Sequence, residues 1–129
     1  MAGIYIHIPF CKQACSYCNF HFSTKLSNKA VMIDTIASEI EARKLYLNNE
    51  PINTIYFGGG TPSLLSEEEL TRLFEVLYKT FEISASAEIT LEANPDDLTL
   101  MKLKSLRSSP INRLSIGVQS FFEEDLRFM

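Results

Sequence analysis

The sequence lacks the features that direct a protein into or across a membrane. No basic region precedes its short apolar run at residues 4 to 10, and no small-residue cleavage site follows that run, as a secretory signal requires. No apolar stretch approaches the roughly 20 residues of a membrane span. We therefore expect a cytoplasmic location and no integral membrane segment.

Positive charge is also scarce. The net charge is −4 and the pI is about 5.2, and lysine and arginine form no extended cluster. This balance gives no general attraction to nucleic acid or to acidic membranes, so we expect no nucleic-acid partner. With 46% apolar and 22% charged residues over 129 positions, the chain has the composition of one globular domain with a core.

Cysteine is also scarce, and the positions of the cysteines are informative. The chain has three cysteines, Cys11, Cys15 and Cys18, spaced as C-x3-C-x2-C. An odd, tightly spaced set is a poor disulfide framework and fits a soft metal centre better. A [4Fe–4S] cluster normally takes four thiolates, so three would leave one iron open to a non-cysteine ligand. Two alternatives remain: free or buried cysteines, and structural zinc with His21 as the fourth ligand.

Alternating elements run through the chain. Each β-rich segment is followed by a loop and a segment with helical periodicity, which predicts an α/β fold with a parallel sheet and right-handed crossovers. Expected strands cover residues 4–8, 54–57, 88–93 and 113–118, and expected helices cover residues 28–48, 70–81, 99–108 and 121 to the end. Capping boxes are expected at Ser66 with Glu69 and at Ser120 with Glu123. The glycines at positions 58 to 60 are expected to form a loop that no regular element accepts.

The chain has too few elements for a complete barrel. Four units do not close a barrel of six or eight strands, and the sequence ends inside a helical pattern without a stop signal. We expect residues 1–129 to be the N-terminal part of a core domain, without the rest of the barrel or a C-terminal region. Uncovered strand edges and apolar faces would then favour self-association.

Four motifs follow one another along nearly the whole chain: IYIHIPFCKQACSYC, YFGGGTPS, EANP and RLSIGVQS. The cysteine motif after a first strand resembles the signature of the radical S-adenosylmethionine (SAM) family. Together the motifs resemble its oxygen-independent coproporphyrinogen III oxidase group, which contains the HemN enzymes and the HemW-type heme chaperones. The resemblance implies a partial parallel (β/α) barrel of the radical SAM type.

The same resemblance implies cofactors and partners. In this family a [4Fe–4S] cluster donates one electron to SAM, which splits into methionine and a 5′-deoxyadenosyl radical. An electron donor such as flavodoxin or ferredoxin is implied, with heme or porphyrin as the partner molecule. Heme is also a candidate bound ligand.

The resemblance further assigns site residues. The cluster ligands would be Cys11, Cys15 and Cys18. SAM would contact Tyr5, Tyr17, Gly59, Gly60, Thr61, Glu92 and Gln119. Core packing is the alternative for the two tyrosines, and a solvent-facing position is the alternative for Glu92. No catalytic residue is assigned, and His7 receives no role.

One position separates the two functions in this group. HemN enzymes carry a further cysteine two residues after the third, and here that position is Phe20. This favours a HemW-type heme chaperone that binds and delivers heme. The alternative is a coproporphyrinogen III dehydrogenase that oxidatively decarboxylates propionate side chains, so whether the protein is an enzyme stays open.

Overall fold

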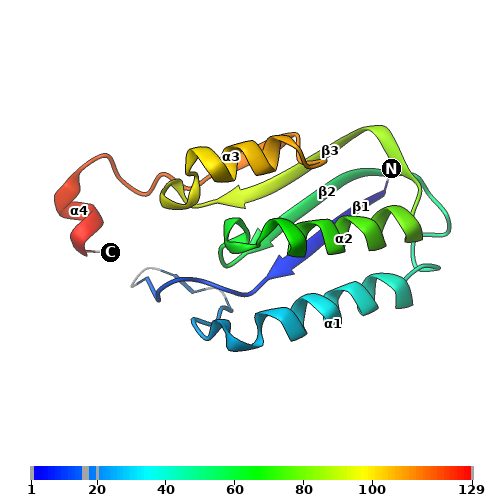
Figure 1. The fold of residues 1–129 in the computed structure, drawn as a ribbon, viewed down its shortest axis with the longest axis horizontal. Helices are drawn as coiled ribbons and strands as arrows, with labels where there is room; N and C mark the ends of the chain where they lie inside the picture. Colours follow the sequence, from blue (N-terminus) through cyan, green and yellow to red (C-terminus); the bar gives the residue numbers. More distant parts are fainter. Residues whose placement is uncertain (1, 16–17, 20, 129) are drawn as a thin grey trace.

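A four-stranded parallel sheet forms the centre of the molecule. The computed structural model describes residues 2–15, 18–19 and 21–128. The strands lie in the order β1-β2-β3-β4, and each pairs in parallel with the next (Figure 1). Their bounds are Ala2–Ile8 for β1, Ile52–Gly59 for β2, Ile83–Ala93 for β3 and Arg113–Ile116 for β4. The predicted α/β class with a parallel sheet is confirmed.

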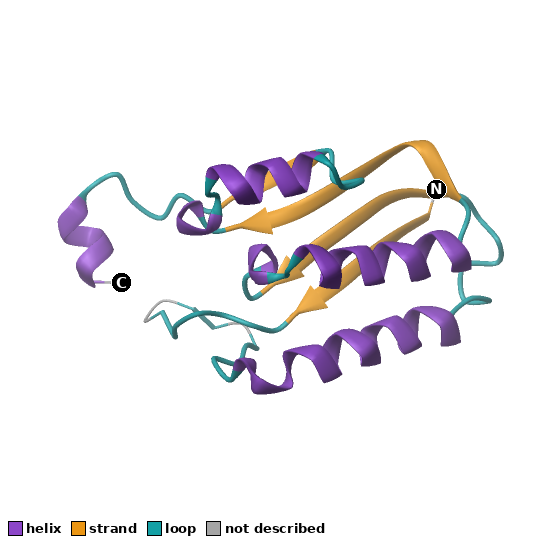
Figure 2. Ribbon diagram, in the orientation of Figure 1, coloured by secondary structure: helices purple, strands orange, loops and turns teal. Residues whose placement is uncertain are grey.

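Helices connect the strands. They are α1 (Lys29–Ala42), α2 (Glu67–Thr80), α3 (Leu100–Arg107) and α4 (Glu123–Phe128), with short 3-10 turns η1 (Leu26–Asn28), η2 (Pro62–Leu64) and η3 (Pro95–Asp97). Figure 2 shows α1, α2 and α3 beside the sheet and α4 apart from it, beyond the strand ends. No helix in the described part of the chain is long and apolar enough to cross a bilayer.

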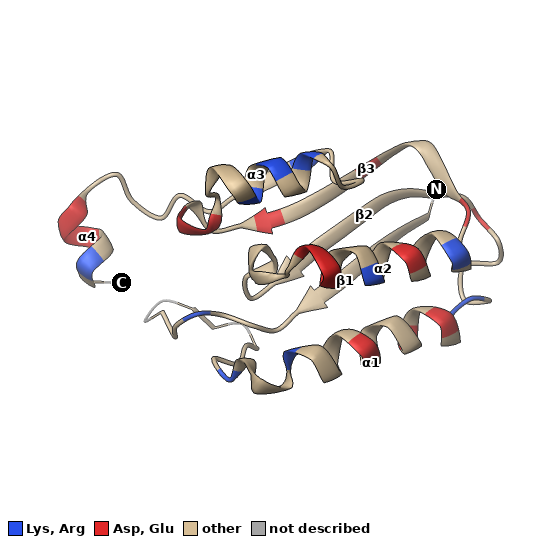
Figure 3. Ribbon diagram, viewed as in Figure 1, with Lys and Arg blue, Asp and Glu red and all other residues tan. Residues whose placement is uncertain are grey.

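The sheet has two different faces because side chains alternate along each strand. One face is buried under the helices, where Ile8, Phe57 and Leu91 of the strands join one core with Ile33 of α1 and Leu73 of α2. The other face is polar and aromatic and lacks a helical cover. In Figure 3, β1 and β2 carry no charged residue, whereas β3 carries acidic residues on the sheet. A ligand could therefore approach the sheet from the uncovered face.

Three local predictions are wrong. The first helix ends at Ala42, because its buried residues stop at Ile40 and a run of turns leads to Asn48 and Asn49 in the left-handed region. Gly58 and Gly59 belong to β2 rather than to a loop.

The third concerns the helix caps. The Ser66–Glu69 capping box is confirmed, with Glu69 N donating to Ser66 Oγ and Ser66 N to Glu69 Oε2. The second expected box does not form. Ser120 Oγ accepts from Phe122 N at 3.0 Å and donates to the carboxylate of Asp125 at 2.6 Å, so it does not cap Glu123.

Candidate functional site

The cysteine loop leaves the carboxyl end of β1. Its two ends are held together, since Cys11 N donates to Ser23 O at 3.1 Å and Ser23 N donates to Pro9 O at 2.7 Å. Cys11, Cys15 and Cys18 are free thiols, and each is half-buried. Three free thiols on one short loop are a donor set suited to soft metals and iron–sulfur clusters.

The thiols are on one loop but are not arranged as ligands. Among the described residues, no three histidine, cysteine, aspartate or glutamate side chains are grouped as they would be around a metal ion. The structure therefore does not bring His21 into a set with the cysteines. The donor set fits a cluster by its chemistry and its position, and binding would draw the thiolates together.

The end of β2 contacts the start of the cysteine loop. Gly60 N donates to Ile8 O at 2.8 Å, and Thr61 N donates to Phe10 O at 2.7 Å. The Thr61 hydroxyl donates a hydrogen bond to Cys11 Sγ at 3.5 Å. A Cβ at Gly60 would lie 2.6 Å from Phe10 O and 3.0 Å from Cys11 Sγ. Glycine at position 60 therefore permits a close approach of two strand ends, which brings Gly60 and Thr61 beside Cys11.

Gly58 and Gly59 have a different reason to be glycine. A Cβ at Gly58 would lie 2.9 Å from the rings of Tyr5 and Tyr56. Gly59 has φ +111°, and a Cβ there would lie 2.6 Å from the His7 ring. These glycines thus leave room on the uncovered face of the sheet for aromatic side chains from β1 and β2.

Glu92, near the carboxyl end of β3, lies on that uncovered face. Its Oε1 accepts a hydrogen bond from the Tyr56 hydroxyl at 2.6 Å, and its Oε2 accepts one from Gly59 N at 3.2 Å. The Glu92 hydrogen bond, and then burial, raises the pKa of Tyr56. Glu92 is half-buried and is the second-last residue of β3, so it lies near the carboxyl end of the sheet, where α/β folds bind ligands.

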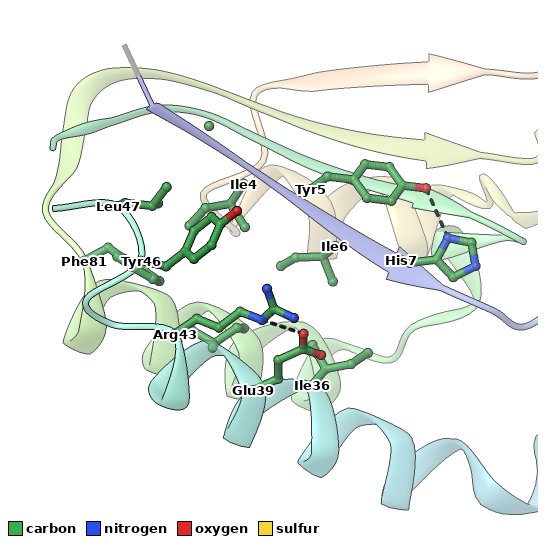
Figure 4. A pocket seen from close by; sticks show the side chains of 12 residues that line it. Ile4, Tyr5, Ile6, His7, Ile36, Glu39, Arg43, Tyr46, Leu47 and Phe81 are labelled. Atoms are coloured by element: carbon green, nitrogen blue, oxygen red, sulfur yellow. Dashed lines mark hydrogen bonds and ion pairs between the residues drawn. The ribbon is translucent and has the colours of Figure 1, made fainter. Parts of the chain in front are cut away.

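Tyr5 and His7 extend this group along β1. Tyr5 is 58% exposed, so it is not part of the core formed by the described residues. Its ring stacks on that of Tyr56 with centroids 6.0 Å apart. Partial burial, and then the negative charge of Glu92, raises the pKa of Tyr5. The Tyr5 hydroxyl lies 3.2 Å from His7 Nδ1 (Figure 4), and His7 Nε2 lies 3.3 Å from His21 O. A tautomer protonated at Nε2 satisfies both, with the Tyr5 hydroxyl donating to Nδ1.

Two of these residues were missed by sequence reasoning. Tyr56 was not singled out, and His7 was given no role. A signal existed for both, since Tyr5 and His7 share a face by strand alternation and Tyr56 is two residues before Gly58.

Gln119 and Tyr17 are the other residues predicted to contact SAM. Gln119 follows β4 and is exposed, and within the described residues no hydrogen bond joins it to Glu92 or Tyr56. Tyr17 and Phe20 lie outside the described residues.

A groove of about 330 Å³ runs between β1 and α1 (Figure 4). It is lined mainly by apolar side chains, with Glu39 and Arg43 of the α1 side paired at 2.7 Å. Its lining includes none of the cysteines and none of the glycines at positions 58 to 60. The groove is therefore separate from the cysteine loop, although Tyr5 and His7 of the site also line it.

The arrangement gathers three kinds of group at the carboxyl ends of parallel strands, where α/β folds bind ligands. Soft donors lie on the loop after β1, a glycine-rich backbone segment lies at the end of β2, and a carboxylate with tyrosine partners lies on β3. Such a set can hold a metal centre beside a polar organic ligand.

This chain matches a known family model and several known proteins. The model of the radical SAM superfamily matches residues 5–129. The heme chaperone HemW of Bacillus subtilis is 40% identical over 98% of this chain and 34% of its own length. The oxygen-independent coproporphyrinogen III oxidase of Escherichia coli is 35% identical over 98% of this chain and 28% of its own length.

The solved structure of coproporphyrinogen III oxidase (HemN) from Escherichia coli, described as a radical SAM enzyme, superposes with a TM-score of 0.88 at 35% identity. It covers 97% of this chain and 29% of that one. The chain thus spans about a third of the length of these relatives. The predicted fold of the radical SAM type is confirmed, and the chain belongs to the radical SAM superfamily.

Proposed function

We propose that this protein binds a [4Fe–4S] cluster through Cys11, Cys15 and Cys18 and binds SAM at the neighbouring strand ends. The observation that carries the proposal is the contact between the cysteine loop and the end of β2, where Thr61 Oγ1 lies 3.5 Å from Cys11 Sγ. These three thiolates would hold the cluster and leave one iron without a cysteine ligand, and the bound cluster would supply the electron that SAM cleavage requires.

The polar groups nearby suit SAM. Glu92 accepts from Tyr56 and from Gly59 N, and a carboxylate retains further acceptor capacity for the donors of a ligand. Tyr5 offers an exposed aromatic ring beside it. Backbone groups of Gly59, Gly60 and Thr61 border the loop, and Tyr17 and Gln119 complete the proposed contacts.

For the whole protein we propose a role in heme metabolism as a HemW-type heme chaperone that binds and delivers heme. The residue that favours this role is Phe20, which stands where HemN enzymes carry a further cysteine. Phenylalanine can neither ligate a metal nor donate a proton. HemW of Bacillus subtilis, at 40% identity, is also among the similar proteins.

Coproporphyrinogen III dehydrogenase is the second candidate. The observation in its favour is the 35% identity to the coproporphyrinogen III oxidase of Escherichia coli over nearly this whole chain. Either role requires an electron donor for cluster reduction, which we propose to be flavodoxin or ferredoxin. A cytoplasmic location fits both roles, since a reducing compartment keeps the three thiols available for iron.

The test separates the two roles in the whole protein, reconstituted without oxygen. It is incubated with SAM, a reductant and coproporphyrinogen III, and chromatography follows protoporphyrinogen IX. In a second arm the protein is titrated with heme. We expect stoichiometric heme binding and no decarboxylation. Multiple turnovers of decarboxylation would contradict the chaperone role, and failure of the wild type to take up iron would contradict the proposed site itself.

A further inference from the structure

One buried carboxylate connects three strand ends at the site. Lys12, next to Cys11 on the cysteine loop, forms an ion pair with Asp97 of η3, which follows β3. The other oxygen of Asp97 accepts a hydrogen bond at 2.7 Å from the hydroxyl of Ser63 in η2, which follows β2. Figure 1 shows the loops after β1, β2 and β3 at the same end of the sheet. Asp97 thus joins the cysteine loop to the other two.

The burial of Asp97 distinguishes this contact from an ordinary surface pair. The Asp97 side chain is 6% exposed, whereas that of Lys12 is 57% exposed. Exposed ion pairs contribute little to stability, whereas a carboxylate that is shielded from water needs partners to offset the cost of burying its charge. Both oxygens of Asp97 are paired, one with an ammonium group and one with a hydroxyl. Losing either partner would leave a desolvated charge incompletely satisfied.

The turn η2, whose Ser63 hydroxyl donates to Asp97, is itself firmly held. Lys29 of α1 donates to Leu64 O at 3.0 Å, and Lys102 of α3 donates to Leu65 O. Ser63 lies between these contacts and the Gly60 segment, and it also accepts from Asn94 N at 3.2 Å. Two helices and the end of β3 therefore fix η2, so Asp97 gives Lys12 a rigid point of attachment.

The rest of the cysteine loop has few such attachments. In the described part of the loop beyond Cys11, the other contact to the sheet's side chains is that between His7 Nε2 and His21 O, near the loop's far end. The ion pair of Lys12 is thus the contact that restrains the first half of the loop. That half leads from Cys11 to Cys15.

We propose that Asp97 is a positioning residue that acts through Lys12, holding the first half of the cysteine loop against the ends of β2 and β3. The inference rests on the proposed cluster site, because the restrained segment carries two of its ligands. When the ion pair between Lys12 and Asp97, here called the tether, is broken, the loop should move away from the strand ends more often. Thiolates and bound iron would then become more accessible to reagents, although the core of the sheet is untouched.

The first test uses the metal-free protein and needs no cluster. Trypsin cuts after lysine, so the rate of cleavage after Lys12 reports how often this side chain is released. We expect Asp97→Asn to raise that rate roughly tenfold or more, since a hydrogen bond to a charged group is worth about that factor. Cleavage after Lys44, beyond α1, is the internal reference. Asp96→Asn is the matched control, because Asp96 is an exposed neighbour in the same turn whose carboxylate makes no such pair in the described residues.

The second test uses reconstituted protein and measures the rate of iron transfer to a chelator. Lys12→Met and Asp97→Asn should each speed iron loss several-fold, whereas Lys12→Arg should restore retention because it keeps the charge. Lys12 is largely exposed, so Lys12→Met keeps the test valid if Asp97→Asn does not fold. A wild-type rate of cleavage after Lys12 in Asp97→Asn, together with wild-type rates of iron loss in Lys12→Met and Asp97→Asn, would overturn the proposed role of the ion pair. Failure of the wild type to take up iron would overturn the proposed cluster site, and the trypsin assay would still decide the tether.

Discussion

Replacing Gly60 with alanine tests whether close backbone contact, rather than turn formation, explains this glycine. The added Cβ would lie 2.6 Å from Phe10 O and 2.9 Å from Phe10 N. Real Cβ atoms do not approach backbone so closely, and Phe10 is 3% exposed and belongs to the core. The strand end and the cysteine loop must therefore move apart.

The cost follows from what has to move. Overpacking of a rigid site costs about 1–3 kcal/mol. The shift also strains the hydrogen bond from Thr61 N to Phe10 O, now 2.7 Å, which is worth about 1 kcal/mol. Alanine returns about 0.4–1 kcal/mol by restricting the unfolded chain. We expect the free energy of unfolding to fall by about 2 kcal/mol, the difference of these effects.

Urea unfolding of the metal-free protein measures this change. Gly117→Ala is the matched control, because its Cβ would meet only the end of the flexible Gln119 side chain, at 2.9 Å from Nε2. We expect the control to stay within about 0.5 kcal/mol of the wild type. A wild-type midpoint and slope for Gly60→Ala would refute the reasoning, since the backbone contact would then have no energetic consequence.

Three further predictions concern the cluster, the carboxylate and the exposed surface. Anaerobic reconstitution should give about four irons per chain and Cys15→Ser should abolish the cluster, by iron and sulfide analysis with electron paramagnetic resonance; one tightly bound zinc without iron uptake would contradict this. Because Glu92 raises the pKa of Tyr56, Glu92→Gln should lower it in ultraviolet titration. The associated stability is complete below the ordinary tyrosine pKa of about 10 and is lost at higher pH, so the wild type should lose more stability there than the variant. Exposed apolar side chains at Met101, Phe121 and Phe128 should cause self-association or binding of a surface-reporting dye; a monodisperse monomer with a sharp melt would contradict it.

The fold could be predicted because its determinants are local and repeated. Ile6 and Ile8 of β1 and Ile55 and Phe57 of β2 recur at every second position, and all four are buried on the covered face of the sheet. Helical spacing likewise identified the buried face of α2. Glycine-rich patterns predicted loops less reliably, because a glycine can be needed to leave space for a neighbouring side chain rather than to form a turn. Gly58 remains in β2 and leaves room for the rings of Tyr5 and Tyr56, and only the paired strands reveal that need.

The polar part of the site could be predicted only where one residue type implies a chemistry. Three closely spaced cysteines imply a soft metal centre wherever the chain places them. The pairing of Lys12 with Asp97 joins positions 85 residues apart, and that of Tyr56 with Glu92 joins positions 36 apart. A single sequence carries no signal for such pairs, because lysine, aspartate, tyrosine and glutamate are ordinarily exposed and solvated. These contacts depend on the register of the parallel strands.

That register also orients the polar and aromatic groups on the uncovered face of the sheet. Tyr5 pairs with Tyr56 across β1 and β2, so their rings stack, and Glu92 reaches back from β3 to the Tyr56 hydroxyl and Gly59 N. Each oxygen of Glu92 accepts a hydrogen bond from the protein, so its carboxylate is oriented before any ligand arrives, and each oxygen keeps further acceptor capacity. A ligand that brings hydrogen-bond donors would meet an acceptor already in place, which reduces the ordering cost of binding. Because the same glycine strand end also contacts Cys11 through Thr61, a shift in either group would disturb the other.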